Sequence, residues 1–306
     1  MALETNDSDP FAASSAEKLG RRALSVSQYK QFERCAYSWY LARVKLAWQR
    51  PAAWLPQGSA EHTVFELVAR GDFSMSLEEA QALFTQEYSK EVAEYTKITP
   101  NFEWWSKSGP YGGKRDLERR YKLGLEQIER FYAWREKTPH EVIWITPDGK
   151  PAIELEFNMD LDGVLVRGYI DAVVVNQNKS VTNYKGLGAH FRGDDRGDRQ
   201  PEEVPWLVVR DYKSGNQPGD DFQLAVYAVA IQDMYGTFGP YEGDYWMGRT
   251  GKPTYPYDLR DWTREKVTEK FHELEENIQA GNFDPTPSAS ACAFCDVRDA
   301  CEFRMA

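Results

Sequence analysis

The chain has 306 residues, of which 42% are hydrophobic and 14% aromatic, and its formal net charge is -11 at pH 7. These values predict a folded globular protein, and no segment approaches the roughly 20 apolar residues that a membrane-spanning helix needs. The negative charge disfavours a protein that coats nucleic acid by bulk attraction, but it is compatible with a DNA-processing enzyme that has a basic groove. Residues 1–17 are polar and acidic and lack the pattern of a secretion signal, so we expect a cytoplasmic protein without a membrane span.

The N-terminal part is predicted to be mainly helical. Residues 1–24 are low in hydrophobicity and predict a disordered lead-in. Residues 25–140 follow as a helical part that carries Cys35 and His62. Apolar residues at helical spacing predict four helices in it, over residues 25–44, 58–71, 77–97 and 114–137. Ser25 can cap the first of these helices, and Gly71 ends the second.

Residues 141–284 change to a pattern of strands and helices. Alternating or continuous apolar residues predict three strands, over residues 151–161, 164–175 and 205–215. The first two are separated by Asp162-Gly163, which predicts a hairpin. Two helices are predicted after the third strand, over residues 221–236 and 264–281. The expected fold class is α/β (α+β): a mixed sheet flanked by helices, with a helical N-terminal part.

A polar insertion over residues 176–204 separates the second and third predicted strands. It is too long for an ordinary hairpin turn, and loops of this length are usually functional or disordered. Its basic residues are Lys179, Lys185, Arg192, Arg196 and Arg199. These side chains could contact a phosphate backbone. Because nearby acidic residues offset their charge, a solvated insertion is at least equally expected.

Two acidic residues stand where predicted strands come together. In a strand, Asp211 and Lys213 point to one face while Tyr212 points to the other. Asp171 lies in the strand expected to pair with this one, so two carboxylates can face each other at about 5 Å. Such like charges are costly unless a cation lies between them, and Mg²⁺ or Mn²⁺ suits carboxylate ligands.

Three further side chains could complete a metal-dependent site. His62, on the second predicted helix, would add a nitrogen ligand, which suits Mn²⁺ somewhat better than Mg²⁺. Lys213 would stabilise charge on a phosphate or position the attacking water. Gln223 and Tyr227, four residues apart on a helix, would face the substrate. Each has an ordinary alternative, such as an interior histidine or a surface ion pair, but the combination favours a metal site.

Four motifs between residues 58 and 227 give the chain a resemblance to the RecB-type branch of the PD-(D/E)XK nucleases. They are "GSAEHTVFE", "GYIDAV", "RDYKSG" and "QLAVY". The resemblance implies a restriction-endonuclease-like core in which the acids have catalytic roles and bind a divalent metal. The implied metal ligands are His62, Asp171, Asp211 and the main-chain carbonyl of Tyr212. The implied catalytic lysine is Lys213, with Gln223 and Tyr227 on the substrate side. The insertion between the two acids departs from the family pattern.

The four cysteines form a three-plus-one arrangement. Cys292, Cys295 and Cys301 make a C-x2-C-x5-C pattern in a separate C-terminal region, residues 285–306, and Cys35 lies in the first predicted helix. Zinc sites typically pair cysteines two and two, whereas this arrangement is more typical of an iron–sulfur cluster. Disulfides are the least expected alternative in a cytoplasmic protein.

The cysteine pattern is also similar to that of the iron–sulfur subset of these nucleases, which includes CRISPR-associated and phage exonucleases. The resemblance implies a structural [4Fe-4S] cluster held by the four cysteines, which would clamp the two chain ends together. A cross-link between Cys35 and Cys292 would close a long loop, and such cross-links stabilise by constraining the unfolded chain.

The resulting functional hypothesis is a metal-dependent DNA exonuclease that acts on single-stranded or frayed ends. The resemblance supplies the exonuclease mode, DNA as the partner, and recombination or CRISPR-adaptation proteins as further partners. It also implies the host cytoplasm as the location if the protein is phage-encoded. The alternatives are a non-catalytic DNA-end-binding subunit and, less favoured, a zinc-stabilised scaffold. Trp104 and Trp105 beside Lys107 could stack on bases, although large aromatic residues more often belong to the core.

Overall fold

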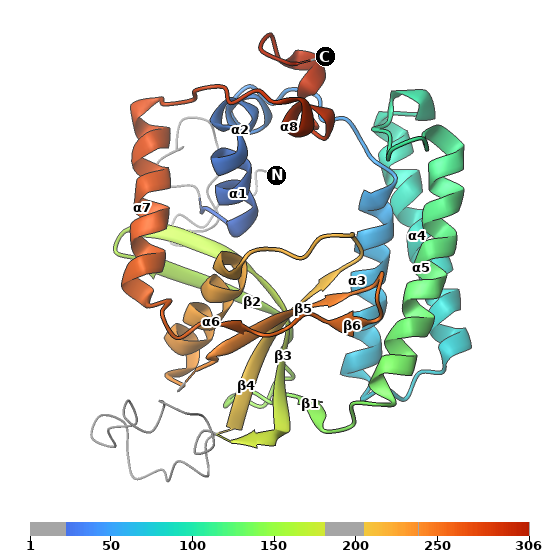
Figure 1. Ribbon diagram of the computed structural model, residues 1–306, viewed down its shortest axis with the longest axis vertical. Helices are drawn as coiled ribbons and strands as arrows, with labels where there is room; N and C mark the ends of the chain where they lie inside the picture. The colour runs from blue at the N-terminus through green and yellow to red at the C-terminus, as the bar shows by residue number, and fades with distance from the viewer. Residues whose placement is uncertain (1–22, 181–204, 238, 306) are drawn as a thin grey trace, which may run out of the picture.

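The computed structural model describes residues 23–180, 205–237 and 239–305. In this part of the chain a seven-stranded mixed sheet is flanked by helices (Figure 1), which confirms the predicted fold class. Almost all of the expected lead-in and of the expected insertion lie outside the described residues. No helix in the described ranges is long and apolar enough to span a bilayer.

The helices and strands have the following bounds. The α-helices are α1 (Val26–Arg34), α2 (Ala36–Arg43), α3 (Trp54–Arg70), α4 (Leu77–Ile98), α5 (Gly113–Arg135), α6 (Asp221–Tyr235), α7 (Arg264–Ala280) and α8 (Ala289–Ala293). Short 3-10 turns are η2 (Phe102–Trp104) and η6 (Arg298–Ala300). The strands are β1 (Glu141–Ile143), β2 (Ile153–Leu161), β3 (Val164–Ser180), β4 (Pro205–Lys213), β5 (Glu242–Met247), β6 (Lys252–Pro253) and β7 (Tyr257–Asp258).

Strand pairing follows the predicted order at the centre of the sheet. The main path is β1-β3-β4-β5-β6, with β2 on β3 and β7 on β5. The β2–β3 hairpin turns at Asp162-Gly163 and β3 pairs with β4, both as expected. The β3–β4 pairing is antiparallel. Helix α6 then connects β4 to β5, which run parallel. Strand β5 was not predicted, because its sequence "EGDYWM" combines two acids with a glycine although all six residues are buried.

The ends of two predicted elements differ from the structure. Strand β3 continues to Ser180, which pairs with Pro205, so it extends into the expected insertion. Lys179 therefore belongs to strand β3. Its ammonium lies 2.6 Å from Glu242 Oε2, so it forms an ion pair within the protein instead of the phosphate contact considered from the sequence. At the N-terminus, Leu24 is buried and its N–H donates to the Leu165 carbonyl, so the last residue of the expected lead-in belongs to the folded core.

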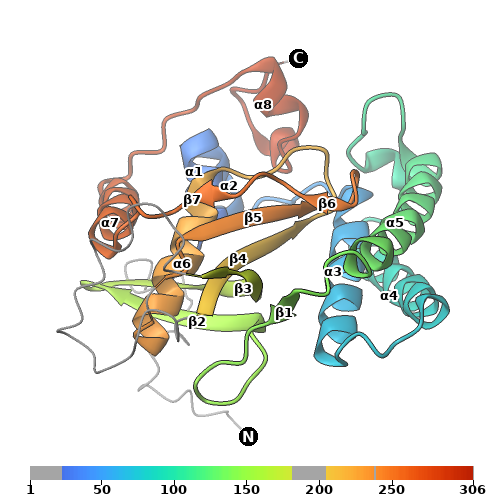
Figure 2. The ribbon, with the colours of Figure 1, turned by 60° about the horizontal axis from the view of Figure 1, so that its bottom comes forward.

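Each face of the sheet carries its own apolar core. One core joins the sheet to α6, α7 and α1, and its large members include Phe157, Phe222 and Phe271. The other core joins the opposite face to α3, α4 and α5, through residues such as Phe65 and Phe131. Helices α4 and α5 approach closely because residue 124 is a glycine: a Cβ there would lie 2.1 Å from the Phe84 ring. Figures 1 and 2 show these two helix groups on opposite sides of the sheet.

The first predicted helix is interrupted at Cys35. This residue is extended, with φ -168 and ψ 105, and it serves both as the last cap of α1 and the first cap of α2. Its N–H donates to the Gln31 carbonyl, and its own carbonyl accepts from the Ser38 hydroxyl at 2.8 Å. The expectation of one helix over residues 25–44 was therefore wrong, because local hydrogen bonds turn the chain there.

The two ends of the described chain meet. Figures 1 and 2 both show α8 next to α1 and α2. The Thr286 hydroxyl donates to the Arg34 carbonyl at 2.7 Å, and the Arg50 N–H donates to the Asp296 carbonyl at 2.7 Å. Tyr37 packs edge-on against Phe303 with ring centroids 5.0 Å apart. The C-terminal segment is thus attached to the N-terminal helices rather than to the sheet.

Candidate active site

The β3–β4 ladder brings the two predicted acids together. Its last pair is Ala172 with Arg210, so Asp171 and Asp211 stand at the next step, where the strands separate. There the Asp171 carboxylate replaces a ladder bond: its Oδ2 accepts the Tyr212 N–H at 2.8 Å. Both aspartates are buried. The predicted pairing of the two strands is confirmed.

The alternation of side chains along β4 is also as predicted. Lys213 Nζ lies 2.7 Å from Asp211 Oδ2, so these two side chains share one face. The Tyr212 ring points to the opposite face and packs against Phe65 and Trp246, at 5.1 and 6.2 Å between centroids. The strand therefore presents an acid and a base together while its tyrosine anchors it in the core.

Helix α6 fixes the Asp211 carboxylate. The Gln223 amide donates to Asp211 Oδ1 and, at 2.9 Å, to the Tyr227 hydroxyl. Tyr227 in turn donates to the same Oδ1 at 3.4 Å. Because the two residues are four positions apart, both reach the carboxylate from one side of the helix. Asp211 thus has one oxygen held by α6 and the other facing the Lys213 ammonium.

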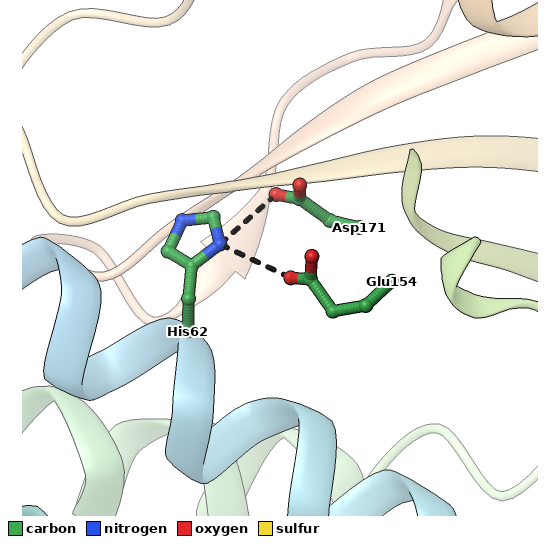
Figure 3. Close-up of side chains that lie close together, drawn as sticks. All are labelled: His62, Glu154 and Asp171. Carbon is green, nitrogen blue, oxygen red and sulfur yellow. Dashed lines mark ion pairs between the residues drawn. The ribbon is translucent and has the colours of Figure 1, made fainter. Parts of the chain in front are cut away.

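His62 reaches the acids from α3. Its Nε2 lies 3.0 Å from the Tyr212 carbonyl oxygen. Its Nδ1 lies 3.5 Å from Asp171 Oδ2 and 3.6 Å from Glu154 Oε1 (Figure 3). The histidine therefore joins two of the predicted ligands, the Asp171 carboxylate and the Tyr212 carbonyl, although they come from different strands.

The tightest group of metal-ligating side chains differs in one member from the prediction. Within the described ranges, His62, Glu154 and Asp171 each offer a ligand atom, and these atoms lie within 4.8 Å of one another. Asp211 is outside this group of three, since its carboxylate is directed to Lys213 and α6. An imidazole with two carboxylates is a donor set that suits Mn²⁺ or Mg²⁺.

Two residues at the site were not predicted. Glu154 belongs to a strand whose other acids give the same outward-facing pattern, and its unusual φ of 44 is invisible in the sequence. Lys30, from α1, places its Nζ 3.2 Å from Gln223 Oε1 and 3.0 Å from Asp220 Oδ1. No sequence signal could connect a lysine to residues some 190 positions away.

Comparison with known proteins agrees with this geometry. The model of the PD-(D/E)XK nuclease superfamily matches residues 23–302. The chain belongs to this superfamily. It is similar to two proteins named Gene 69 protein: one from Mycobacterium phage D29, 51% identical over 284 residues, and one from Mycobacterium phage L5, 48% identical over 304 residues. Each match covers 90% of this chain and 95% of the relative.

Membership of the PD-(D/E)XK superfamily implies nuclease activity that depends on a divalent metal and acts on nucleic acid. The expected restriction-endonuclease-like core is consistent with the sheet and helices described above. The match is to the superfamily as a whole and does not single out a branch. The names of the two phage relatives state no activity.

The charged groups of this candidate site shift each other's pKa values. Burial raises the pKa of Asp171, and the nearby charge of Asp211 raises it further. Burial alone would lower the pKa of His62, but the carboxylates of Asp171, Glu154 and Asp211 outweigh it and raise that pKa to about 10. The imidazolium therefore offsets part of the negative charge when no metal is bound. An entering divalent cation would replace this proton.

A buried glutamate next to His62 should make folding pH-dependent. Burial raises the pKa of Glu61 from 4.5 to about 8, although a hydrogen bond from Gln57 lowers it. Between these values the folded chain holds a proton that the unfolded chain has lost, so stability falls as the pH rises through this window. We expect Glu61→Gln to reduce the fall in melting temperature between pH 4.5 and 8.

Thermal denaturation in EDTA, which removes competing divalent ions, measures this slope. Glu66→Gln on the same helix is the matched control, because Glu66 is only partly buried and pairs with Arg70 at 2.8 Å. A Glu61→Gln protein with the same pH slope as the unchanged protein would contradict the assignment.

The candidate site opens on a cavity of about 1030 Å³, called the basic cavity because of the residues that line it. Lys213, Gln223 and Tyr227 form part of its wall. The basic residues that line it are Lys30, Arg34, Arg43, Arg50, Arg167 and Lys213. Among the described residues, the only acid in this lining is Asp296. A chain with a net charge of -11 therefore gathers positive charge where a phosphate backbone would approach Lys213.

The four cysteines lie together at the junction of the chain ends. All of them are free thiols, are partly buried, and line a single cavity between the α1–α2 break and the C-terminal segment. Within the described part of the chain, its charged lining residues are Arg34, Arg298 and Arg304, without any acid. Although burial raises it, hydrogen bonds from Thr286 and Ser38 lower the pKa of the Cys35 thiol.

Proposed function

We propose that this protein is a divalent-metal-dependent deoxyribonuclease that degrades single-stranded or frayed DNA from an end. The observation that carries the proposal is the placement of Lys213 at the wall of the basic cavity, with its ammonium 2.7 Å from Asp211 and beside the group formed by His62, Glu154 and Asp171. An acid–lysine pair next to candidate metal ligands suits phosphodiester hydrolysis, and the basic lining suits a polyanionic substrate.

The residues would divide the work as follows. His62, Asp171, Asp211 and the Tyr212 carbonyl would hold the metal, with Glu154 as an additional ligand. A bound divalent cation supplies Lewis-acid polarisation of the phosphate and a more acidic water. Lys213 would stabilise negative charge that develops on the scissile phosphate. Gln223 and Tyr227 would keep Asp211 oriented, and Lys30 would keep Gln223 in place.

The choice of substrate rests on the shape of the basic cavity and on the resemblance to RecB-type nucleases. A volume of about 1030 Å³ lies near the upper end of ordinary ligand sites, which suits a few nucleotides of one strand better than a duplex. The exonuclease mode comes from the resemblance. Since the relatives are phage proteins, the proposed place of action is the cytoplasm of the infected cell. Recombination proteins as partners are taken from the resemblance to RecB-type nucleases.

An assay with labelled DNA tests this proposal. The protein is incubated with a linear single strand, a closed circular single strand and a blunt duplex, each with Mn²⁺, Mg²⁺ or EDTA. We expect shortening of the linear strand with metal and no cutting of the circle. Cleavage of the circle would show an endonuclease. Binding without any cleavage would favour the alternative, a non-catalytic DNA-end-binding subunit.

We also propose a structural [4Fe-4S] cluster held by Cys35, Cys292, Cys295 and Cys301. Four thiols that line one cavity are the donor set of such a cluster, whereas zinc sites commonly combine cysteines in two close pairs. The three arginines around that cavity would offset the negative charge of a thiolate-bound cluster. The cluster would reinforce the attachment of the C-terminal segment to α1 and α2.

Replacing Cys35 with serine should lower the stability of the fold more than it lowers the rate of DNA cleavage by the folded protein. The change removes the only proposed cluster ligand in the N-terminal part, so the chain ends lose their cross-link. We expect the free energy of unfolding to fall by at least about 2 kcal/mol. Iron and sulfide analysis and thermal denaturation measure the two effects. Ser290→Ala, in the exposed part of α8, is the control. A stable, fully active Cys35→Ser protein, or zinc in place of iron, would contradict the proposal.

A further inference from the structure

A second groove adjoins the basic cavity and is named here the aromatic groove. Its volume is about 820 Å³, and it lies between the segment after α2, the turn η2 and the C-terminal segment. Its lining includes three exposed or partly exposed aromatic residues and three basic residues: Trp48, Trp104, Phe294, Arg50, Lys107 and Arg298. Arg50 and Phe294 line both the aromatic groove and the basic cavity. The two spaces therefore meet at these side chains.

Aromatic rings are unusually exposed in this groove. Trp104 is 61% exposed, Phe294 57% and Trp48 39%. Exposed rings that gather in one groove mark an interaction site more often than single exposed residues do. The neighbouring Trp105 has the opposite role: it is only 3% exposed, and its indole donates to the Thr99 carbonyl at 3.0 Å. Of the two tryptophans that the sequence offered for stacking, only Trp104 is available.

The backbone that carries Trp104 and the rings of Trp48 and Phe294 are held in place. Trp104 ends the turn η2, whose start is capped by the Asn101 side chain accepting the Glu103 N–H at 3.0 Å. The Trp48 indole N–H donates to the Thr99 hydroxyl at 3.2 Å, which fixes one edge of that ring. Phe294 stands edge-on to Trp54, with centroids 6.2 Å apart. Fixed rings lose little entropy when a flat ligand stacks on them.

The charges of the groove identify the class of ligand. Arg50, Lys107 and Arg298 stand among the rings together with two acids, Glu103 and Asp299. Arg50 forms an ion pair with Asp299, so the described lining keeps an excess of one positive charge. Aromatic faces combined with cations suit unpaired nucleotides, whose bases stack while their phosphates contact the cations. The bases of a duplex are already stacked on each other, so a duplex cannot use these rings in the same way.

We propose that the aromatic groove binds unpaired nucleotides of the DNA strand whose end lies at Lys213, so that strand length determines affinity. This inference rests on the proposed nuclease function and adds a subsite to it. A strand long enough to pass from the basic cavity past Arg50 and Phe294 reaches Trp104 and Trp48. A shorter oligonucleotide fills the basic cavity alone and does not reach these rings.

Binding measurements in a non-cleaving background test the inference. Fluorescence anisotropy of labelled oligothymidylates of increasing length is measured with Lys213→Ala protein, alone and with Trp104→Ala. We expect Trp104→Ala to weaken binding of long strands about 10-fold and to leave the shortest bound strands unchanged. Trp104→Phe keeps an aromatic face and should restore most of the affinity. Tyr255→Ala, at an aromatic residue that is 95% exposed outside both spaces, is the control.

The outcomes separate this inference from the proposed function. The subsite alone is overturned if Trp104→Ala does not change the affinity for long strands. This reading requires that the protein binds DNA and that the unsubstituted protein cleaves it. The subsite is also overturned if Trp104→Ala weakens binding of a blunt duplex as much as binding of a single strand, because the groove would then not depend on unpaired bases. Absence of both DNA binding and cleavage overturns the proposed function together with the subsite. Circular dichroism confirms that each variant is folded.

Discussion

Changing Lys213 to alanine should lower the rate of DNA cleavage by about 100- to 1,000-fold and leave DNA binding nearly intact. The ammonium lies 2.7 Å from Asp211 Oδ2 at the wall of the basic cavity, where a scissile phosphate would acquire charge. Single-turnover cleavage of a labelled strand with Mn²⁺ separates the chemical step from binding. Lys213→Arg should not restore the rate, because a planar guanidinium does not replace a compact ammonium.

The control for this experiment is Lys252→Ala. Lys252 is an exposed lysine on β6, outside the lining of the basic cavity, and its loss should leave cleavage unchanged. If Lys213→Ala cleaves at the same rate as the unsubstituted protein, Lys213 is not the catalytic lysine. If both binding and cleavage are lost together while folding is kept, Lys213 would be a substrate-binding residue instead.

Asp171→Asn should remove the response of the protein to divalent metal and should not destabilise the metal-free protein. Burial and the nearby charge of Asp211 raise the pKa of Asp171, so its charged form is costly although the His62 imidazolium offsets part of that cost. Asparagine is neutral and can still accept the Tyr212 N–H that Asp171 Oδ2 accepts. We expect Mn²⁺ to raise the melting temperature of the unsubstituted protein but not that of the variant.

Thermal denaturation with Mn²⁺ and with EDTA measures both halves of this expectation, and isothermal titration calorimetry with Mn²⁺ gives the affinity directly. Glu156→Gln is the matched control, since Glu156 is an exposed acid on the same strand as Glu154 and should keep the metal response. A variant that keeps the full Mn²⁺ stabilisation would remove Asp171 from the ligand set. Glu154→Gln in the same assay shows whether the Glu154 carboxylate also contributes to metal binding.

Much of the nuclease core could be predicted because its signals are local. Alternation along β4 places Asp211 and Lys213 on one face, and the spacing of four places Gln223 and Tyr227 together on α6. The turn at Asp162-Gly163 sets the β2–β3 hairpin. Such features depend on residues close in sequence, so backbone geometry and side-chain period are sufficient to infer them.

Strand β5 shows why local signals fail elsewhere. Its acids Glu242 and Asp244 are buried, which a strand pattern would not predict. The Lys179 ammonium lies 2.6 Å from Glu242, and the Arg210 guanidinium forms a bidentate pair with Asp244 at 2.7 and 2.8 Å. The partners that make burial tolerable come from other strands, so only the assembled sheet reveals that this segment belongs inside.

The sequence by itself determined most elements of the core, though not β5, together with the two acids, their lysine and the superfamily to which they point. Only the tertiary structure decided that Glu154 joins His62 and Asp171, that Lys30 supports Gln223, and that basic residues from distant segments line one cavity. The physical reason is the sequence separation over which each effect acts. Local hydrogen bonding and side-chain alternation act over a few residues, so the local sequence pattern is enough to predict them. The convergence of charges depends on how whole elements pack, and packing is set by the two cores on opposite faces of the sheet.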